Sequence, residues 1–159
     1  RVNAQGVDLN RNWPTEDWTD PAFHGAVVVD AGDEPLSEPE TAVLFGYFER
    51  TMPALVMSWH GYGSLVEAND WGPAEALGGR FAREAGYELF EKWPFYPITG
   101  EMIVALAEIG VPAFDVELDR WTSIEEDIGR NLAGLISILE MIDGGMPAAL
   151  SASVPEVAP

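Results

Sequence analysis

Short apolar runs alternate with helix-like segments along the sequence, and this alternation restricts the fold more than any other feature. Two runs, PALVMSWH at 53–60 and PAFDVEL at 112–118, have the length and apolar content of buried strands. Helical spacing of apolar residues covers about 38–49, 73–86 and 101–109 and resumes from 124. Such an order predicts an α/β fold in which helices flank a mixed, mostly parallel sheet.

The ends of the expected helices carry recognisable signals. Ser37 with Glu40, and Ser123 with Glu126, each form a capping-box pattern at a helix start. Glycines at 144 and 145 end the last helix, and prolines and a glycine mark 93–100 as a loop. We therefore expect one domain, or a portion of one, over 1–145 and a loose Ala/Pro/Ser/Val-rich tail over 146–159.

Composition excludes several classes of partner. The chain has 159 residues, 47% of them hydrophobic, which is enough for a packed core. A net charge of −19 argues against nucleic acid and anionic membrane surfaces as partners, and simple solubility explains it. No apolar run is long enough to span a membrane, and without cysteine neither disulfides nor thiolate zinc sites can form.

Polar residues end both predicted strands, where α/β proteins bind ligands. His60 closes the first run, and Glu117 lies near the end of the second. Strand alternation places Asp115 on the same face as Glu117, and two like charges there would raise at least one carboxyl pKa, as acid–base catalysis requires. The alternative interpretations are that His60 is a structural histidine and that Asp115 and Glu117 lie on a solvated strand face. The glycines beside Tyr62 in HGYG suit a turn that lines a site.

The stretch GVDLNRNW, at 6–13, concentrates recognition chemistry near the start of the sequence. The planar guanidinium of Arg11, next to the amide of Asn10, is well suited to bind a carboxylate. In so acidic a chain, a structural salt bridge of Arg11 is the alternative interpretation.

These segments together resemble the zinc metallocarboxypeptidases, the M14 peptidases. RVNAQGVDLNRNW at 1–13 matches that family's R-x-N-x-x-G-V-D-L-N-R-N-F/W motif. Three further family segments have matches in the same order along the chain: SEPE at 37–40, HGYG at 60–63 and GVPAFDVEL at 110–118. The resemblance covers about 1–143 and implies the carboxypeptidase-like α/β fold, with a zinc ion as cofactor and a peptide as substrate.

The resemblance also implies a role for each matching residue. His60 would be the third zinc ligand, and Glu117 the general base that activates water and then protonates the leaving amine. Arg1 would polarise the scissile carbonyl. Asn10 and Arg11 would hold the C-terminal carboxylate of the peptide, which makes such an enzyme an exopeptidase.

Three further residues receive roles from the same comparison. Tyr96 would be the mobile tyrosine that closes over the substrate. Asp8 would orient a zinc-binding histidine from behind. Tyr62 would line the substrate site, and the Gly61–Tyr62 peptide corresponds to a cis bond in the family.

One family feature has no match in this sequence. The H-x-x-E motif that supplies the other two zinc ligands is absent, so the zinc site is incomplete. We expect the chain to be a fragment that holds the C-terminal portion of a catalytic domain and is inactive alone. Its partner would then be the missing N-terminal half, and without it the chain would be marginally stable or prone to aggregate because a strand edge is unpaired.

The substrate preference is the least constrained feature. Asp115, near the expected side-chain pocket, favours a lysine, an arginine or a related diamino acid at the C-terminus of the substrate. Met102 and Ile103 favour an apolar residue instead. A catalytically inactive carboxylate-binding module and an aspartoacylase-like amide hydrolase are the alternative functions. The family resemblance favours an extracellular or periplasmic location over the cytoplasm.

Overall fold

The computed structural model describes residues 2–69 and 72–144, which fall into two compact units. Unit 1 is formed from 1–54 and 93–111, and unit 2 from 55–92 and 112–159. The predicted tail at 146–159 and the predicted catalytic residue Arg1 lie outside the described residues. Within the described part, none of the helices combines the length and the apolar character that a membrane crossing demands.

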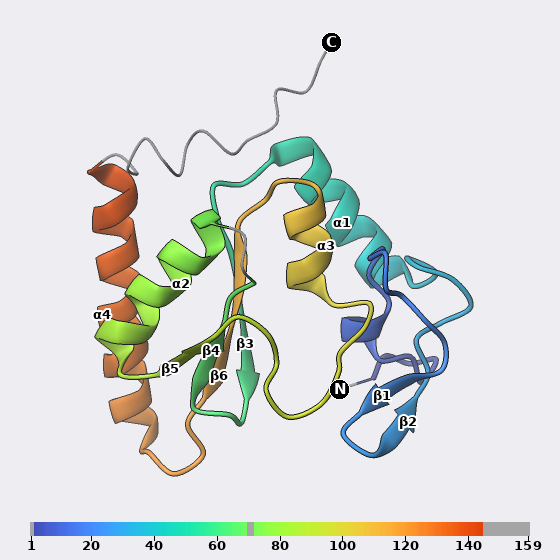
Figure 1. Ribbon diagram of the computed structural model, residues 1–159, viewed down its shortest axis with the longest axis horizontal. Coiled ribbons are helices and arrows are strands. Elements are labelled where there is room, and N and C mark those ends of the chain that lie inside the picture. The colour runs from blue at the N-terminus through green and yellow to red at the C-terminus, as the bar shows by residue number, and fades with distance from the viewer. Residues whose placement is uncertain (1, 70–71, 145–159) are drawn as a thin grey trace. The chain divides into compact units, whose positions relative to one another are not determined.

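Unit 1 carries the GVDLNRNW stretch and is mostly loop (Figure 1). Its strands form an antiparallel hairpin in which His24 pairs with Val27. The sequence predicts only loop there, because each strand has three residues and shows no measurable alternation. The elements of unit 1 are the 3₁₀ helix η1 (Leu9–Arg11), strands β1 (Ala22–His24) and β2 (Val27–Val29), and helices α1 (Pro39–Thr51) and α3 (Met102–Glu108).

Unit 2 contains a four-stranded sheet with the order β3-β6-β4-β5 (Figure 1). β3 and β6 are parallel, β4 and β5 are parallel, and β4 is antiparallel to β6. The sheet is therefore mixed and mostly parallel, as predicted. The elements of unit 2 are β3 (Val56–Gly61), β4 (Leu65–Glu67), α2 (Gly72–Ala85), β5 (Glu88–Phe90), β6 (Ala113–Leu118) and α4 (Ile124–Asp143).

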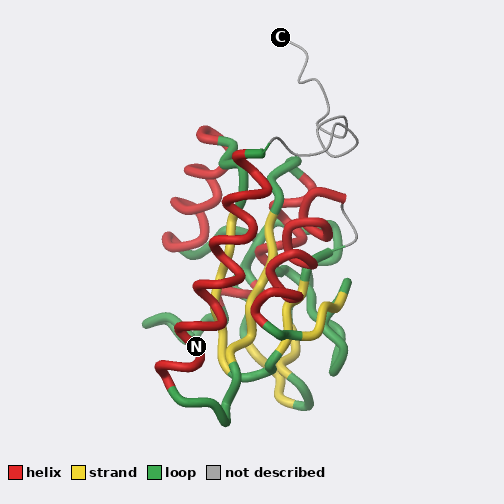
Figure 2. The backbone as a smooth tube through the Cα atoms, turned by 90° about the vertical axis from the view of Figure 1, so that its left-hand side faces the viewer, coloured by secondary structure: helices red, strands yellow, loops and turns green. Residues whose placement is uncertain are grey.

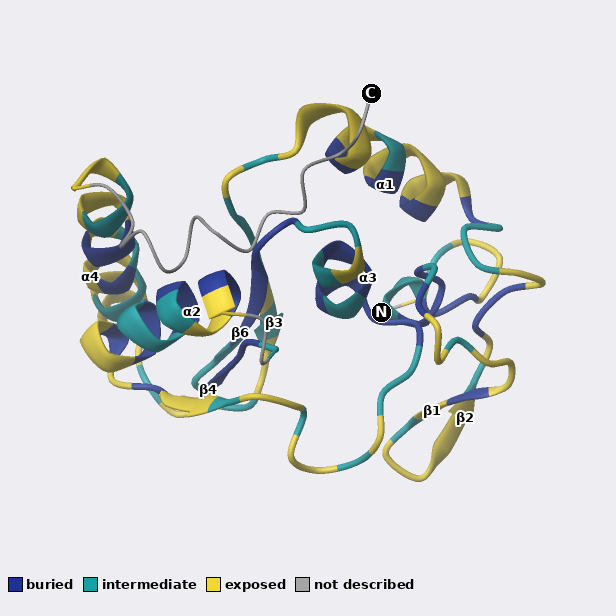
Figure 3. Cartoon of the chain, turned by 45° about the horizontal axis from the view of Figure 1, so that its top comes forward, coloured by how far each residue is buried: buried dark blue, intermediate teal, exposed yellow. Residues whose placement is uncertain are grey.

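The core of unit 2 lies between the sheet and helices α2 and α4. In Figure 2 the long helix α4 lies in front of the strands, and in Figure 3 the inward faces of α2 and α4 and most of β6 are buried. The rings of Phe81 and Phe114 pack at 5.5 Å between centroids, and both side chains are fully buried. The predicted face of β6 is confirmed, since Phe114, Val116 and Leu118 all belong to this core.

The two capping-box predictions have different outcomes. Ser123 caps α4 and accepts a hydrogen bond from the amide of Glu126, as predicted. The prediction for Ser37 is wrong, because Glu38 is the N-cap residue of α1 and makes no side-chain cap bond. The Ser37 hydroxyl instead accepts a hydrogen bond from the Asn12 side chain, a partner distant in sequence.

Candidate active site

The carboxyl ends of β3 and β6 bring two predicted site residues together in unit 2. His60 of β3 is the register partner of Glu117 of β6. Because the strands are parallel, both residues lie at the end of the sheet where the carboxyl termini of these strands meet. Proteins with α/β folds bind ligands at this end. Both are partly buried rather than fully exposed. An imidazole and a carboxylate are thus adjacent at the place where the sequence analysis expected them.

Asp115 lies two residues before Glu117, on the same face of β6. It contacts His60 from the interior of the unit. Its Oδ2 is 3.5 Å from His60 Nε2, and its Oδ1 accepts a hydrogen bond from the Ser58 hydroxyl. The Ser58 oxygen is also 3.2 Å from His60 Nε2. Both partners meet the same ring nitrogen, so Nδ1 is the nitrogen of His60 that can bind another group.

Burial governs the charge of Asp115, which is 3% exposed. Burial raises the pKa of its carboxyl above the usual value, while His60 and the Ser58 hydroxyl act in the opposite direction. The like charge of Glu117, from which strand alternation predicts such a rise, is not among its causes, and burial is the largest of them. The contacts of Asp115 favour a role in orienting His60, whereas its predicted role in substrate preference stays a prediction.

The turn after His60 approaches Glu117 closely. The Gly61–Tyr62 peptide is cis, as the family resemblance implied, and the Tyr62 side chain is largely exposed beside Arg120. A Cβ atom on Gly63 would lie 2.7 Å from Glu117 Cβ. Only glycine fits at that position without displacing the Glu117 side chain.

In unit 1 the GVDLNRNW stretch forms the short helix η1. The Asp8 carboxylate is buried and accepts a hydrogen bond from the Asn10 amide, which caps η1. The Asn10 side-chain oxygen accepts a hydrogen bond from the amide of Met102 at the start of α3. The side chains of Met102 and Ile103 are buried. Asp8 therefore shapes the helix that carries Asn10 and Arg11, and its predicted role behind a zinc-binding histidine stays a prediction.

Arg11 is 1% exposed, and neutral groups hold its guanidinium. Nε donates to the carbonyl oxygen of Phe23 and Nη1 to that of Asn10. The alternative interpretation, a structural salt bridge, is not what the described contacts show, because these acceptors are main-chain carbonyls. A buried guanidinium without a carboxylate partner is costly, and a bound carboxylate would neutralise it.

Asn12 was not among the predicted site residues, yet it fixes the stretch to the start of α1. Its buried side-chain amide joins this stretch to a single segment, 31–41, that leads into α1. The neighbouring Trp13 is also buried, and its ring packs on Phe45 and Phe48 of α1. The partners of the Asn12 side chain are the carbonyls of Ala31 and Glu34, the Ser37 and Thr41 hydroxyls and the Glu38 amide.

Tyr96 lies in the predicted loop of unit 1 and contacts His24, the other histidine of the chain. Its hydroxyl oxygen is 2.7 Å from His24 Nδ1. His24 has no predicted role, because 72 residues separate it from Tyr96 and no local pattern links them. Ser58 was missed as well, although the period of two along β3 could have shown that it shares a face with His60.

The donor set does not fit a complete catalytic zinc site. Such a site takes three protein ligands and leaves one position for water. Among the described residues, no group of three or more His, Cys, Asp or Glu side chains is placed to hold a metal ion. His60 is the one predicted ligand, so no chemical step through zinc can be derived from the residues described.

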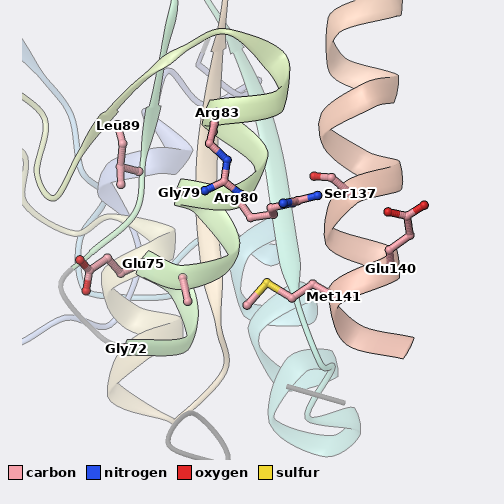
Figure 4. A pocket seen from close by; sticks show the side chains of 10 residues that line it. Gly72, Glu75, Gly79, Arg80, Arg83, Leu89, Ser137, Glu140 and Met141 are labelled. Carbon is pink, nitrogen blue, oxygen red and sulfur yellow. The ribbon is translucent and has the colours of Figure 1, made fainter. Parts of the chain in front are cut away.

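A separate cavity of about 830 Å³ lies beside helices α2 and α4 (Figure 4). Arg80 and Arg83 reach it from α2, and Glu75 and Glu140 also line it. Glu84 lies 3.5 Å from the guanidinium groups of both arginines. Charges of both signs therefore face this cavity, and none of the predicted site residues lines it.

Comparison with known sequences agrees with the resemblance. The model of the zinc carboxypeptidase family, peptidase M14, matches residues 1–83. Murein peptide amidase A of Escherichia coli K12 is 44% identical over 69 residues, which are 38% of this chain and 28% of that protein. The protein of the same name from Vibrio campbellii is 38% identical over 72 residues, with the same coverage of both chains. The chain thus matches less than a third of the length of these curated relatives.

Solved structures share the fold over most of the chain. The murein-tripeptide amidase of E. coli O157 has a TM-score of 0.68 and 26% identity, with 89% of this chain and 60% of that chain covered. Thrombin activatable fibrinolysis inhibitor has a TM-score of 0.73 at 15% identity, with 92% of this chain and 45% of that chain covered. The second likeness concerns the fold alone. With the family model matching residues 1–83, we conclude that the chain belongs to the M14 zinc carboxypeptidase family of peptidases.

Proposed function

We propose that this chain forms part of a zinc-dependent hydrolase that cleaves an amide bond in peptides held through a terminal carboxylate. The observation that carries the proposal is the pairing of His60 with Glu117 at the ends of two parallel strands. A carboxylate beside an imidazole at that edge suits the activation of water. The family supports a peptide substrate and hydrolysis as the reaction.

Arg11 supports the terminal carboxylate as the recognised group. Its guanidinium is buried and bonded to two carbonyl oxygens, which orient it without neutralising its charge. These two contacts occupy two of its five N–H donors. A carboxylate that accepts two of the remaining donors would compensate the buried charge, and Asn10 would add an amide donor.

Glu117 is the proposed base. Its carboxylate would take a proton from the attacking water and then deliver it to the nitrogen of the leaving amine, so the same group serves both halves of the reaction. Gly63 fixes the position of the Glu117 side chain by close approach. Asp115 and Ser58 fix the orientation of His60.

We further propose that His60 is one of the protein ligands of a zinc ion and binds it through Nδ1. The chain matches 60% of the murein-tripeptide amidase chain. We therefore place the other ligands in a part of the domain outside the described residues, and we propose that this part is the partner of the chain.

The surface of unit 2 supports such a partner. One face of α4 exposes a stripe of apolar side chains, among them Ile128 at 61% and Leu132 at 52% exposure. Among the described strands β3 is at the edge of the sheet, and its Trp59 is 46% exposed next to α4, where it donates a hydrogen bond to Asn131. A strand added to β3 and a helix laid on α4 would bury both features.

Murein peptides are the substrate class that we favour, because the relatives with the highest identity given above are murein peptide amidases. A carboxypeptidase that removes a basic C-terminal residue is the second candidate, and the buried acid Asp115 is the observation that favours it. The two candidates share the same base and carboxylate-binding residues and differ in the substrate that fits.

The test uses the full reading frame that encodes this chain. Purified protein with zinc is incubated with murein peptides and with peptides ending in Lys, Phe or Glu, and released amines are measured. We expect Glu117→Gln to lower kcat by at least about a hundredfold. Glu88→Gln is the control, because Glu88 is an exposed carboxylate in the same sheet. Peptide binding without hydrolysis would favour the carboxylate-binding module, and a strong preference for Phe would refute the preference for a basic residue.

A further inference from the structure

The contact between His24 and Tyr96 is the feature of unit 1 that the proposed function does not use. Tyr96 Oη lies 2.7 Å from His24 Nδ1, and the two rings meet edge to face at 5.4 Å between centroids. The phenol donates this hydrogen bond when the imidazole carries its proton on Nε2. Both side chains are partly exposed. The bond is thus well formed and open to competition from water.

The strand that carries His24 also holds the guanidinium of Arg11. The carbonyl oxygen of Phe23, the residue before His24 in β1, accepts the hydrogen bond from Arg11 Nε at 3.0 Å. Pairing with β2 and the complete burial of Ala22 fix the position of β1. Two consecutive residues of one short strand therefore contact the proposed carboxylate-binding arginine and the tyrosine.

The loop that carries Tyr96 is attached at its other end to the GVDLNRNW segment. The carbonyl of Gly100 accepts a hydrogen bond from the amide of Trp13, and the Gly100 amide donates to Thr15 Oγ1. Gly100 has a φ of +63°, and a Cβ there would lie 2.2 Å from the carbonyl oxygen of Arg11. Only glycine can make this approach. The loop is therefore fixed at Gly100, and His24 contacts it four residues earlier.

We propose that His24 is a positioning residue: it holds the Tyr96 phenol and, through β1, sets that phenol at a fixed distance from the Arg11 guanidinium. The proposal rests on the proposed function, in which Arg11 binds the terminal carboxylate of the peptide. Gly100 attaches the loop through its main-chain groups, whereas the His24 bond holds the side chain of Tyr96 itself. His24 thus fixes the position of the tyrosine, and β1 links that position to the proposed carboxylate-binding arginine.

The first experiment measures this contact without any catalysis. The chain has four tyrosines, so ¹³C labelling of tyrosine rings gives four resonance sets, and Tyr96→Phe identifies the relevant one. We expect His24→Leu to shift the Tyr96 ring resonances and His24→Asn, whose amide replaces Nδ1, to restore them. Tyr47→Phe, which removes an exposed phenol from α1, is the control that leaves them unchanged. Tyr96 resonances that do not respond to His24→Leu would refute the proposal.

The second experiment measures kinetics in the full reading frame. Loss of one such positioning hydrogen bond lowers kcat/KM by roughly two- to tenfold. We expect His24→Leu and Tyr96→Phe to have similar effects, the double variant to lose no more than either, and His24→Asn to retain most activity. Effects that multiply in the double variant would show that His24 acts independently of Tyr96 and overturn the proposal. Should the protein hydrolyse no peptide, the proposed function fails, while the resonance experiment still decides the contact.

Discussion

Two glycines of helix α4 allow a matched test of whether packing against α2 excludes a larger side chain. Gly129 and Gly134 both lie inside α4, where alanine is favoured over glycine by about 1 kcal/mol per residue. A Cβ on Gly129 would meet nothing within 4 Å, whereas one on Gly134 would lie 2.7 Å from Cδ2 of Phe81. The same substitution at the two positions therefore adds the same helix propensity and differs only in packing.

The size of the expected change in the free energy of unfolding depends on how little Phe81 can move. Its side chain is fully buried in the unit 2 core and packs on Phe114. Insertion of a methyl group into a filled core costs about 1–3 kcal/mol. Gly134→Ala should therefore be destabilising by about 0–2 kcal/mol after the gain in helix propensity of about 1 kcal/mol. Gly129→Ala should be stabilising by about 1 kcal/mol.

Urea unfolding of the protein from the full reading frame, followed by far-ultraviolet circular dichroism, measures both free energies of unfolding. The two variants should differ by about 1–3 kcal/mol, with Gly129→Ala the more stable. In thermal melts each kcal/mol corresponds to a shift in Tm of roughly 2–4 °C. Equal stabilisation by both substitutions would show that α2 and α4 do not pack closely at Phe81, and the reasoning would be refuted.

The other predictions concern the site. Gly63→Ala should displace the Glu117 side chain and lower kcat about five- to hundredfold in the full reading frame, while the melting temperature falls by only a few degrees. A fall in kcat no larger than that of the control variant Glu88→Gln would contradict this role of Gly63. Asp115→Asn should lower zinc affinity of the full protein about 10- to 100-fold because His60 loses its carboxyl partner, as metal titration would show; unchanged affinity would argue against that role. The 159-residue chain alone should bind less than one equivalent of cobalt at micromolar metal, and a full tetrahedral cobalt spectrum would oppose ligands outside the chain.

The larger elements could be predicted from the sequence because their signals are local. β3 and β6 are apolar runs, and the helices show their own periodicity, so these elements were found within a few residues of their bounds. β1, β2, β4 and β5 have three residues each and depend on pairing with distant strands, which leaves no pattern to detect. Strand alternation also placed Phe114 and Asp115 on opposite faces, as observed.

The contacts that organise the site were harder to predict because they join distant positions. The local capping pattern at Ser37 failed since Asn12, 25 residues earlier, takes its hydroxyl. The contact of His24 with Tyr96 spans 72 residues, and no periodicity reports it. Asp115 was expected to act through its neighbour along the strand, but its observed partners come from β3. Residue types and spacing indicate which groups carry the chemistry, whereas the groups that hold them become visible only in three dimensions.

The two units are interleaved along the chain, and this has a consequence for how the protein can be divided. Each unit takes one segment from the first part of the sequence and another from the second, so the chain passes between units after 54, 92 and 111. No single cut can release either unit whole, and a nonsense mutation before residue 93 removes part of both. Truncation mapping, which locates autonomous modules in many proteins, should therefore find none here, and separate expression of a unit would require a new linker that joins its two segments.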